Sequence, residues 1–335
     1  MVVTGDNTIY YDPYDFEIDS DPYPVWKRMR DNAPLYYNEQ YDFFALSRFD
    51  DVEQGMFDWE TYQSGRGFIR DLGAQMPMRT IGYLLGIPEE DQEAIRDVLD
   101  DALHLEEGRA PSEAIAEAVR DQGQIFAEYL EWRTEHPSDD LMTQLLNAEF
   151  EDETGTIRRL TRDEVLTYVN MLAGAGNETT TRLIGFAGEV LGRHPDQRAE
   201  LVADRSLIPN AIEELLRYES PSPVQSRYVT RDVEIHGRTV PEGSIMVLLN
   251  GSANRDERHF PDGDSFDIHR GIGRHQAFGY GIHLCLGMAL ARLEGRVALD
   301  EVLNRFPEWE VDYDKAQRAR TSTVRGWETL PVRTP

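Results

Sequence analysis

The amino-acid sequence predicts a mainly α fold with a small β subdomain, built as a single domain over residues 1–335. Two observations predict the helices: apolar residues recur at helical spacing over residues 72–148, and again over the long stretch 161–193. A third predicts the β part, because β-branched and aromatic runs bounded by turn residues flank these helices. With 40% hydrophobic content, the chain can bury one large core or two modest ones.

The elements before residue 70 are expected to be short. A helical pattern covers residues 22–32, and the apolar pieces 35–37 and 43–46 suit a hairpin. Residues 48–57 suit another short helix. Residues 62–67 contain two glycines and are predicted to form a loop.

A run of helices is expected next, separated by glycine and proline residues, which end helices. The predicted helices cover residues 72–86, 89–105, 111–136 and 139–148. The acidic run 149–153 follows them. Because its side chains are mostly charged, it is predicted to be a solvated loop.

The longest predicted helix covers residues 161–193, about 50 Å at 1.5 Å per residue. Thr161 and Glu164 open it with the spacing of a capping box, in which each side chain satisfies a free amide of the other residue. Its middle, residues 173–180, reads A-G-A-G-N-E-T-T. Each glycine there weakens the helix by up to about 1 kcal/mol, which indicates that space beside the helix is needed.

A shorter helix over residues 209–218 carries Glu214 and Arg217, which are three positions apart and therefore neighbours on one helical face. Three β-rich pieces follow it, and turns containing glycine separate them. The predicted strands cover residues 224–229, 233–235 and 245–249.

The charge and the termini restrict the partners. A net charge of −28 argues against a surface that binds nucleic acid or anionic lipid. The first 24 residues have neither a basic start nor an apolar run, so neither a signal peptide nor a membrane anchor is expected. A single cysteine does not imply an oxidising compartment. We expect a cytoplasmic protein.

The only cysteine, Cys285, lies in the glycine-spaced stretch 277–287, which reads A-F-G-Y-G-I-H-L-C-L-G. Helical spacing of Leu286, Leu290, Leu293 and Val297 places Cys285 at the start of a helix. Free amides and the helix dipole there would lower the pKa of the thiol and favour the metal-binding thiolate. The three glycines of the stretch allow a flat ligand to approach the backbone closely.

The pattern F-G-x-G-x-H-x-C-x-G in this stretch resembles the haem-thiolate signature of the cytochrome P-450 family. The resemblance implies that Cys285 is the proximal ligand of haem iron and that His283 lies near a haem propionate. It also implies that the other fixed positions of the pattern form the haem-binding loop. These positions are Phe278, Gly279, Gly281 and Gly287.

Three further patterns agree with this resemblance. A-G-x-E-T-T is similar to the family's distal helix, where small residues such as Ala175 leave room above the haem and the pair Glu178 and Thr179 relays protons to dioxygen. Glu214 and Arg217 resemble a buried pair that braces the cysteine-bearing loop. Arg227 resembles an arginine that binds a haem propionate.

One expected residue of the brace is absent. The family often supplies a further arginine shortly before the cysteine loop, where this chain has Ser265, and Arg270 is the candidate substitute.

The resemblance implies a monooxygenase that uses haem b to insert one atom of dioxygen into an apolar small molecule. Electrons would come from NAD(P)H through a reductase and a ferredoxin or flavodoxin. Basic residues near Cys285 are expected to attract this acidic donor. They are Arg274, His275, Arg292 and Arg296.

Two alternatives stay open. Several dozen residues that family members carry are missing between Phe68 and Ile69, which also favours a haem-binding protein with impaired catalysis. A zinc protein that uses Cys285 together with a histidine is the other alternative, although no C-x-x-C or H-E-x-x-H spacing supports it. Its candidate ligands are His269, His275 and His283.

Overall fold

The computed structural model describes residues 9–13, 15, 18, 21–41, 43–57, 62–63, 75–92, 95, 126–319, 321 and 324–334. The chain folds into two compact units, which we describe separately. The first unit comprises Met1–Phe68, Leu183–Ala319 and Arg325–Pro335, and the second comprises Ile69–Arg182 and Arg320–Val324. The predicted site of the missing segment, between Phe68 and Ile69, lies outside the described residues.

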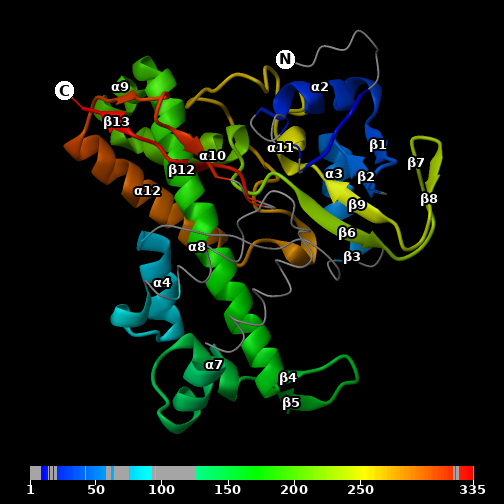
Figure 1. The fold of residues 1–335 in the computed structure, drawn as a ribbon, viewed down its shortest axis with the longest axis vertical. Helices are drawn as coiled ribbons and strands as arrows, with labels where there is room; N and C mark the ends of the chain where they lie inside the picture. Colours follow the sequence, from blue (N-terminus) through cyan, green and yellow to red (C-terminus); the bar gives the residue numbers. More distant parts are fainter. Residues whose placement is uncertain are drawn as a thin grey trace. The chain divides into compact units, whose positions relative to one another are not determined.

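A five-stranded sheet in the order β1-β2-β9-β6-β3 organises one side of the first unit (Figure 1). Its strands are β1 Leu35–Asn38, β2 Phe43–Leu46, β3 Tyr62–Gln63, β6 Gln225–Val229 and β9 Ile245–Leu248. β1 and β2 form the predicted hairpin, with Leu35 opposite Leu46. β2 then pairs in parallel with β9, so the two predicted β regions form one sheet. The predicted loop 62–67 was wrong at its start, because Tyr62 pairs with Val229.

Every residue of β2 is buried. A strand buried on both faces needs apolar side chains at every position, which explains the sequence Phe-Phe-Ala-Leu. Two apolar clusters use these side chains: Phe44 and Leu46 pack with Val229 and Met246, while Phe43 and Ala45 pack in a separate cluster.

Three helices of the first unit match the predicted ranges 22–32, 48–57 and 209–218, and the predicted strand 233–235 is also present. The predicted helix after Cys285 begins at Met288, and the structure adds further short helices and strands that were not predicted. The helices are α2 Tyr23–Asn32, α3 Phe49–Phe57, α9 Pro195–Ala203, η1 Arg205–Leu207, α10 Ile208–Tyr218, α11 Asn250–Ala253, η2 Gly281–His283 and α12 Met288–Arg305. The remaining strands are β7 Val233–Ile235, β8 Arg238–Val240, β10 Glu310–Val311, β11 Gln317–Arg318, β12 Trp327–Thr329 and β13 Val332–Arg333.

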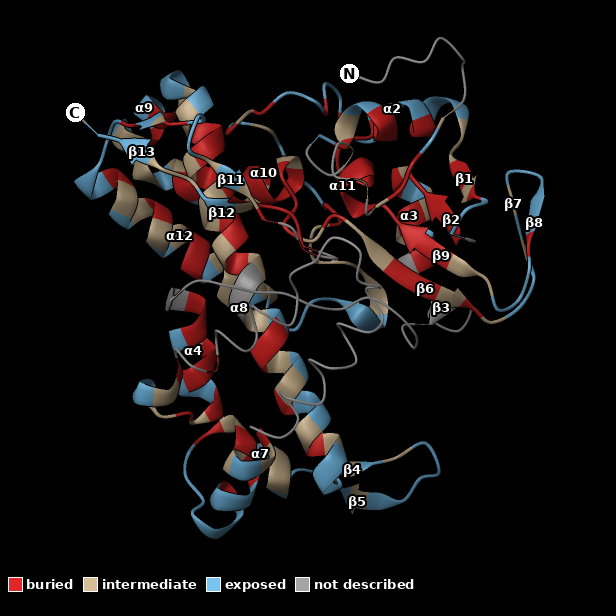
Figure 2. Ribbon diagram, viewed as in Figure 1, coloured by how far each residue is buried: buried red, intermediate tan, exposed pale blue. Residues whose placement is uncertain are grey.

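Helix α10 is largely buried, and its ribbon is mainly red in Figure 2. It packs against α12, where Gly295 allows the approach: a Cβ atom there would lie 3.0 Å from Leu183 and 3.3 Å from Ile212. Both are close contacts for a Cβ atom. A larger residue at 295 would therefore push α12 away from α10.

The second unit contains α4 Gln75–Leu85, α7 Leu141–Asn147, β4 Glu149–Glu151, β5 Ile157–Arg159 and the part of α8 before Leu183. Residues 126–135 are also helical. The apolar core of this unit includes Met78, Ile81, Phe126 and Val169. The predicted helices 72–86 and 139–148 are confirmed where they are described. Most of the predicted helix 89–105 and the first half of the predicted helix 111–136 lie outside the described residues.

Helix α8, Arg162–Arg193, begins as the capping box predicts. The Thr161 amide donates to Glu164 Oε2 at 2.7 Å, and the Glu164 amide donates to Thr161 Oγ1 at 3.3 Å. At Gly176 the space beside the helix is filled by Ile81 of α4, since a Cβ atom there would lie 3.2 Å from the Ile81 side chain. In the described part of the chain, neither α8 nor any other helix is long and apolar enough to cross a membrane.

The predicted solvated loop 149–153 was wrong, because β4 and β5 form an antiparallel hairpin. Oppositely charged side chains pair across the strands, since Arg159 contacts Glu149 at 3.1 Å. In addition, the Arg158 guanidinium lies over the Phe150 ring, 4.6 Å from its centre. Cross-strand pairing of opposite charges stabilises a hairpin that composition alone does not reveal.

Candidate functional site

The loop that carries Cys285 closes on itself between η2 and α12. The Cys285 amide donates to the Phe278 carbonyl at 2.9 Å. Gly279 and Gly281 have φ angles of 69° and 71°, a left-handed conformation that favours glycine. Both predicted glycines are therefore needed for the turn that presents Cys285.

The surroundings of the Cys285 sulfur differ from the prediction. Helix α12 begins at Met288, so Cys285 precedes the helix. Although Cys285 is exposed as a residue, protein atoms around the sulfur displace water and raise the pKa of the thiol. The amides of Gly287 and Met288 and the charge of Arg292 act in the opposite direction, but less strongly. The prediction that the helix start favours the thiolate is wrong for the polypeptide alone, because desolvation disfavours the charged form.

An exposed apolar surface surrounds Cys285. Ile282, Leu284 and Leu286 of the loop are exposed by 62%, 44% and 80%. The apolar stripe that predicted α12 continues this surface, since Leu293 and Val297 are also exposed, while α12 buries a different face. Contiguous exposed apolar side chains indicate a surface that binds an apolar ligand or partner.

Two basic side chains lie near this surface. Arg227 of β6 is buried, and its Nε has no hydrogen-bond partner among the residues that the structure describes. Burial lowers the pKa of Arg227. Burial, followed by the charge of Arg227, also lowers the pKa of His283. An anionic group here would stabilise both side chains, as the propionates of haem would.

Glu214 and Arg217 form the predicted ion pair, and both side chains are fully buried. Arg217 Nε and Nη2 donate to the two Glu214 carboxylate oxygens at 2.7 and 2.8 Å. The remaining guanidinium hydrogens bind backbone carbonyls of the segment that leads to the cysteine loop. These carbonyls belong to Asn254, Gly263 and Ser265, at 2.8, 2.7 and 3.0 Å.

Arg270 is the third member of this network, as the sequence suggested. Its Nε donates to Glu214 Oε1 at 3.2 Å, and the Asp267 amide donates to the same oxygen at 2.9 Å. The Arg270 guanidinium also binds three backbone carbonyls, including that of Ser265 at 2.9 Å. Ser265 therefore takes part through its backbone.

Most of the predicted basic residues near Cys285 contact acidic side chains in the structure. Arg292 makes a bidentate ion pair with Glu213, and the His275 side chain is 3% exposed and contacts the same carboxylate. Arg274 pairs with Glu53. Arg296 Nε is buried without a hydrogen-bond partner among the described residues. Long-range acidic partners, which the local sequence does not show, contact three of the four predicted residues: Arg274, His275 and Arg292.

The predicted proton-relay residues lie on α8 in the second unit. Thr179 is half-buried, and its hydroxyl donates to the Ala175 carbonyl one turn earlier at 3.2 Å. Ala175 is exposed. Glu178 lies within the helix, but its side chain is outside the described part. The structure thus describes only the hydroxyl of the predicted pair.

The zinc alternative has no ligand set among the residues that the structure describes, because no three His, Cys, Asp or Glu side chains group there in a way that could hold a metal ion. His269 contacts Glu200 at 2.7 Å, and His275 contacts Glu213 at 3.2 Å. These carboxylates hold the two histidine rings in contacts that zinc binding would break.

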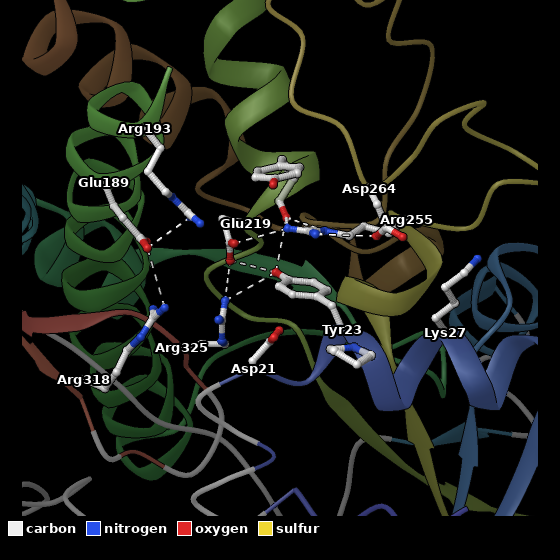
Figure 3. Close-up of a pocket in the computed structure, with 12 residues that line it drawn as sticks. Asp21, Tyr23, Lys27, Glu189, Arg193, Glu219, Arg255, Asp264, Arg318 and Arg325 are labelled. Carbon is white, nitrogen blue, oxygen red and sulfur yellow. Dashed lines mark hydrogen bonds and ion pairs between the residues drawn. The ribbon is translucent and has the colours of Figure 1, made fainter. Parts of the chain in front are cut away.

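A cavity of about 590 Å³ in the first unit has none of the predicted site residues among its lining residues (Figure 3). Ionisable side chains line it, and Glu219 accepts from Tyr23 at 2.8 Å, from Arg255 at 3.2 Å and from Arg325. Arg255 lies between the rings of Tyr23 and Tyr218, at 3.4 and 3.9 Å from their centres. This polar cavity does not suit a flat apolar ligand, and the Glu219 network joins α2, α10 and the C-terminal segment.

Comparison with known proteins gives consistent results. The cytochrome P-450 family model matches residues 110–329. The chain is 34% identical to cytochrome P-450 123 of Mycobacterium tuberculosis, over 99% of this chain and 98% of that protein. It is 40% identical to cyclomarin C epoxidase CymV of Salinispora arenicola, over 79% of this chain and 67% of that protein.

Solved structures show the same similarity. CYP109E1 from Bacillus megaterium in complex with testosterone superimposes with a TM-score of 0.86 at 25% identity, covering 95% of this chain and 99% of that one. Cytochrome P-450 CREJ superimposes with a TM-score of 0.84 at 25% identity, covering 98% and 100%. The predicted mainly α fold class is therefore confirmed.

The sequence alignment with the Mycobacterium protein shows that the chain is internally shortened. The alignment with the Mycobacterium protein spans 404 positions, whereas this chain has 335 residues, and nearly all of both chains is covered. The difference therefore consists of internal positions that only the relative contains. Their placement between Phe68 and Ile69 stays a prediction.

Replacing Glu214 by Ala is expected to destabilise the protein by about 3–5 kcal/mol, because Arg217 would remain buried without its carboxylate partner. Urea unfolding of the cofactor-free protein measures the loss. Glu301→Ala is the matched control, since Glu301 pairs with Arg305 on the surface of α12, and a loss of less than about 1 kcal/mol is expected there. Equal losses in the two variants would contradict the buried brace.

The raised pKa of Cys285 predicts slow alkylation in the cofactor-free protein. Only the thiolate reacts with iodoacetamide, so the rate at pH 8 should be lower than that of free cysteine and should still rise above pH 9. Mass spectrometry follows a single product, because the chain has one cysteine. A rate that levels off below pH 8 would show that the loop favours the thiolate after all.

Proposed function

Because the chain belongs to the cytochrome P-450 family, we propose that it is a haem-dependent monooxygenase that inserts one atom of dioxygen into an apolar small molecule. The observation that carries this proposal is the Cys285 loop, which matches the haem-thiolate pattern and lies near two basic side chains that an anion would stabilise. Relatives named as an epoxidase and a hydroxylase support oxygen insertion as the type of reaction.

The family implies haem, and the residues of the first unit fit haem b. Cys285 would bind the iron, while Arg227 and His283 would bind propionates. Phe278 and the glycines 279, 281 and 287 would let the loop backbone lie close to the ring. Bound in this way, haem supplies the activation and cleavage of dioxygen, which no amino-acid side chain provides.

We propose that Glu178 and Thr179 deliver protons during this cleavage. The Thr179 hydroxyl donates to the Ala175 carbonyl, which orients it along α8. To pass on a proton, it must give up this weak local bond, whose loss costs little in a helix that keeps its backbone hydrogen bonds.

Electrons would reach the iron from NAD(P)H through a reductase and a ferredoxin or flavodoxin, in the cytoplasm. The bacterial origin of the similar proteins supports this proposal. The strongly acidic net charge favours neither a nucleic acid nor an anionic membrane as partner. Arg274 and Arg292 already pair with Glu53 and Glu213, so these arginines are not proposed as the docking surface.

A second candidate function is haem binding with impaired catalysis. The internal shortening relative to the Mycobacterium protein favours it, because lost segments can include residues that cover the substrate. The same Cys285 loop would carry both functions. Spectra and product analysis together distinguish them.

The reduced protein with carbon monoxide is expected to absorb at about 450 nm, and Cys285→Ser should abolish this band, because a neutral hydroxyl poorly replaces the thiolate. A band accompanied by product supports the monooxygenase. A band without product for any substrate or electron donor supports the impaired protein. Absence of the band in the parent protein would refute haem-thiolate ligation.

Thr179→Ala is expected to lower the product formed per NAD(P)H severalfold and to raise hydrogen peroxide, because the proton donor is lost while haem binding persists. Thr167→Ala is a matched control. Its hydroxyl makes the same contact one turn back, with Asp163 at 2.8 Å, but lies outside the small-residue stretch. If the two variants form the same amount of product per NAD(P)H, Thr179 has only a structural role.

A further inference from the structure

Glu213, the neighbour of the buried Glu214 on α10, contacts one residue before Cys285 in the chain and one residue after it. Arg292, seven residues after Cys285, donates to it through Nε at 2.7 Å and Nη2 at 2.8 Å. His275, ten residues before Cys285, lies with Nε2 at 3.2 Å from Glu213 Oε2. One carboxylate therefore ties together the two ends of the segment that presents the cysteine.

The contact between Glu213 and Arg292 fixes the guanidinium in place. A bidentate pair sets both the position and the plane of the group, which a single hydrogen bond does not. The Arg292 guanidinium also lies over the Phe278 ring at 4.7 Å from its centre. The Phe278 carbonyl in turn accepts a hydrogen bond from the Cys285 amide. The charge of Arg292 is thus held against the same loop residue that orients the cysteine.

The orientation of His275 is also determined. The Ala277 amide donates to His275 Nδ1 at 3.2 Å, so Nδ1 is an acceptor and the proton of the neutral ring is on Nε2, which faces Glu213. The carboxylate accordingly accepts from both partners. Burial alone would raise the pKa of Glu213, but hydrogen bonds from His275 and Arg292 lower it to about 2, so Glu213 is charged at neutral pH.

Arg292 acts on the sulfur electrostatically. Its guanidinium lies over the Phe278 ring at 4.7 Å from the centre, and the Phe278 carbonyl binds the Cys285 amide, so its charge acts on the loop at short range. Glu213 is opposite in sign and in direct contact with Arg292, so it offsets most of this positive charge as seen from the loop. The net charge beside the sulfur then depends on both residues.

We propose that Glu213 is a positioning residue that holds Arg292 beside Cys285 and offsets its charge, so that the pair sets the reduction potential of the iron. This inference rests on the proposed function, in which Cys285 binds haem iron. Reduction adds one electron, so a positive charge nearby raises the potential and a negative charge lowers it.

The single variants are expected to shift the potential in opposite directions. Glu213→Gln leaves the charge of Arg292 without its counterion and should raise the midpoint potential. Arg292→Gln leaves the charge of Glu213 and should lower it. The double variant removes both charges and should return close to the parent value. A brace without electrostatic effect would instead shift the potential in the same direction in both single variants, or not at all.

Spectroelectrochemical titration of the haem-loaded protein measures these potentials. Glu301→Gln on the same helix is the matched control, because Glu301 pairs with Arg305 on the surface, and no shift is expected. Thermal unfolding of the cofactor-free proteins provides a second readout, in which both single variants should lose similar stability through loss of the shared ion pair.

Shifts of the same sign in the two single variants, or no shift, would overturn the proposal while leaving haem-thiolate ligation intact. If Arg292→Gln does not load haem, Arg292→Lys takes its place. It keeps the charge, so its potential should lie much closer to the parent than that of Glu213→Gln, and an equal shift would also overturn the proposal. A parent protein without the thiolate spectrum would instead show that the proposed function is wrong.

Discussion

The buried ion pair between Glu214 and Arg217 is the interaction on which the first unit depends. Removing two charges from water costs several kcal/mol per ion, and their attraction offsets this only when the remaining hydrogen-bonding positions are also filled. Here three carbonyls bind Arg217, while the Asp267 amide and Arg270 bind Glu214. The chain from Asn254 to Arg270 can adopt this course only if α10 holds both charges in place.

The same helix contributes two adjacent glutamates with different surroundings. Glu214 is fully buried and holds the segment that leads to the cysteine loop. Glu213 is 20% exposed and holds the loop itself, through His275 and Arg292. Successive residues on a helix point about 100° apart, so one short helix can serve both the core and the loop.

The polypeptide alone leaves unfavourable groups around Cys285. The thiol pKa is raised, and large apolar side chains of the loop are exposed. Arg227 is buried, and none of the residues that the structure describes binds its Nε. A ligand that combines a metal, an apolar ring and anionic groups would improve all three environments at once. Binding of such a ligand to the folded state alone would stabilise the protein by mass action.

The sequence by itself determined what depends on residues close together in the chain: the capping box and length of α8, the hairpin of β1 and β2, and the pairing of Glu214 with Arg217. Such features arise from backbone periodicity and spacing within a few residues. Only the tertiary structure decided the parallel pairing of β2 with β9, the outward direction of the apolar stripe on α12, and the neutralisation of Arg292 by Glu213. These depend on partners tens to hundreds of residues away, so solvent exposure, and with it the pKa of Cys285, was fixed only when those partners came together.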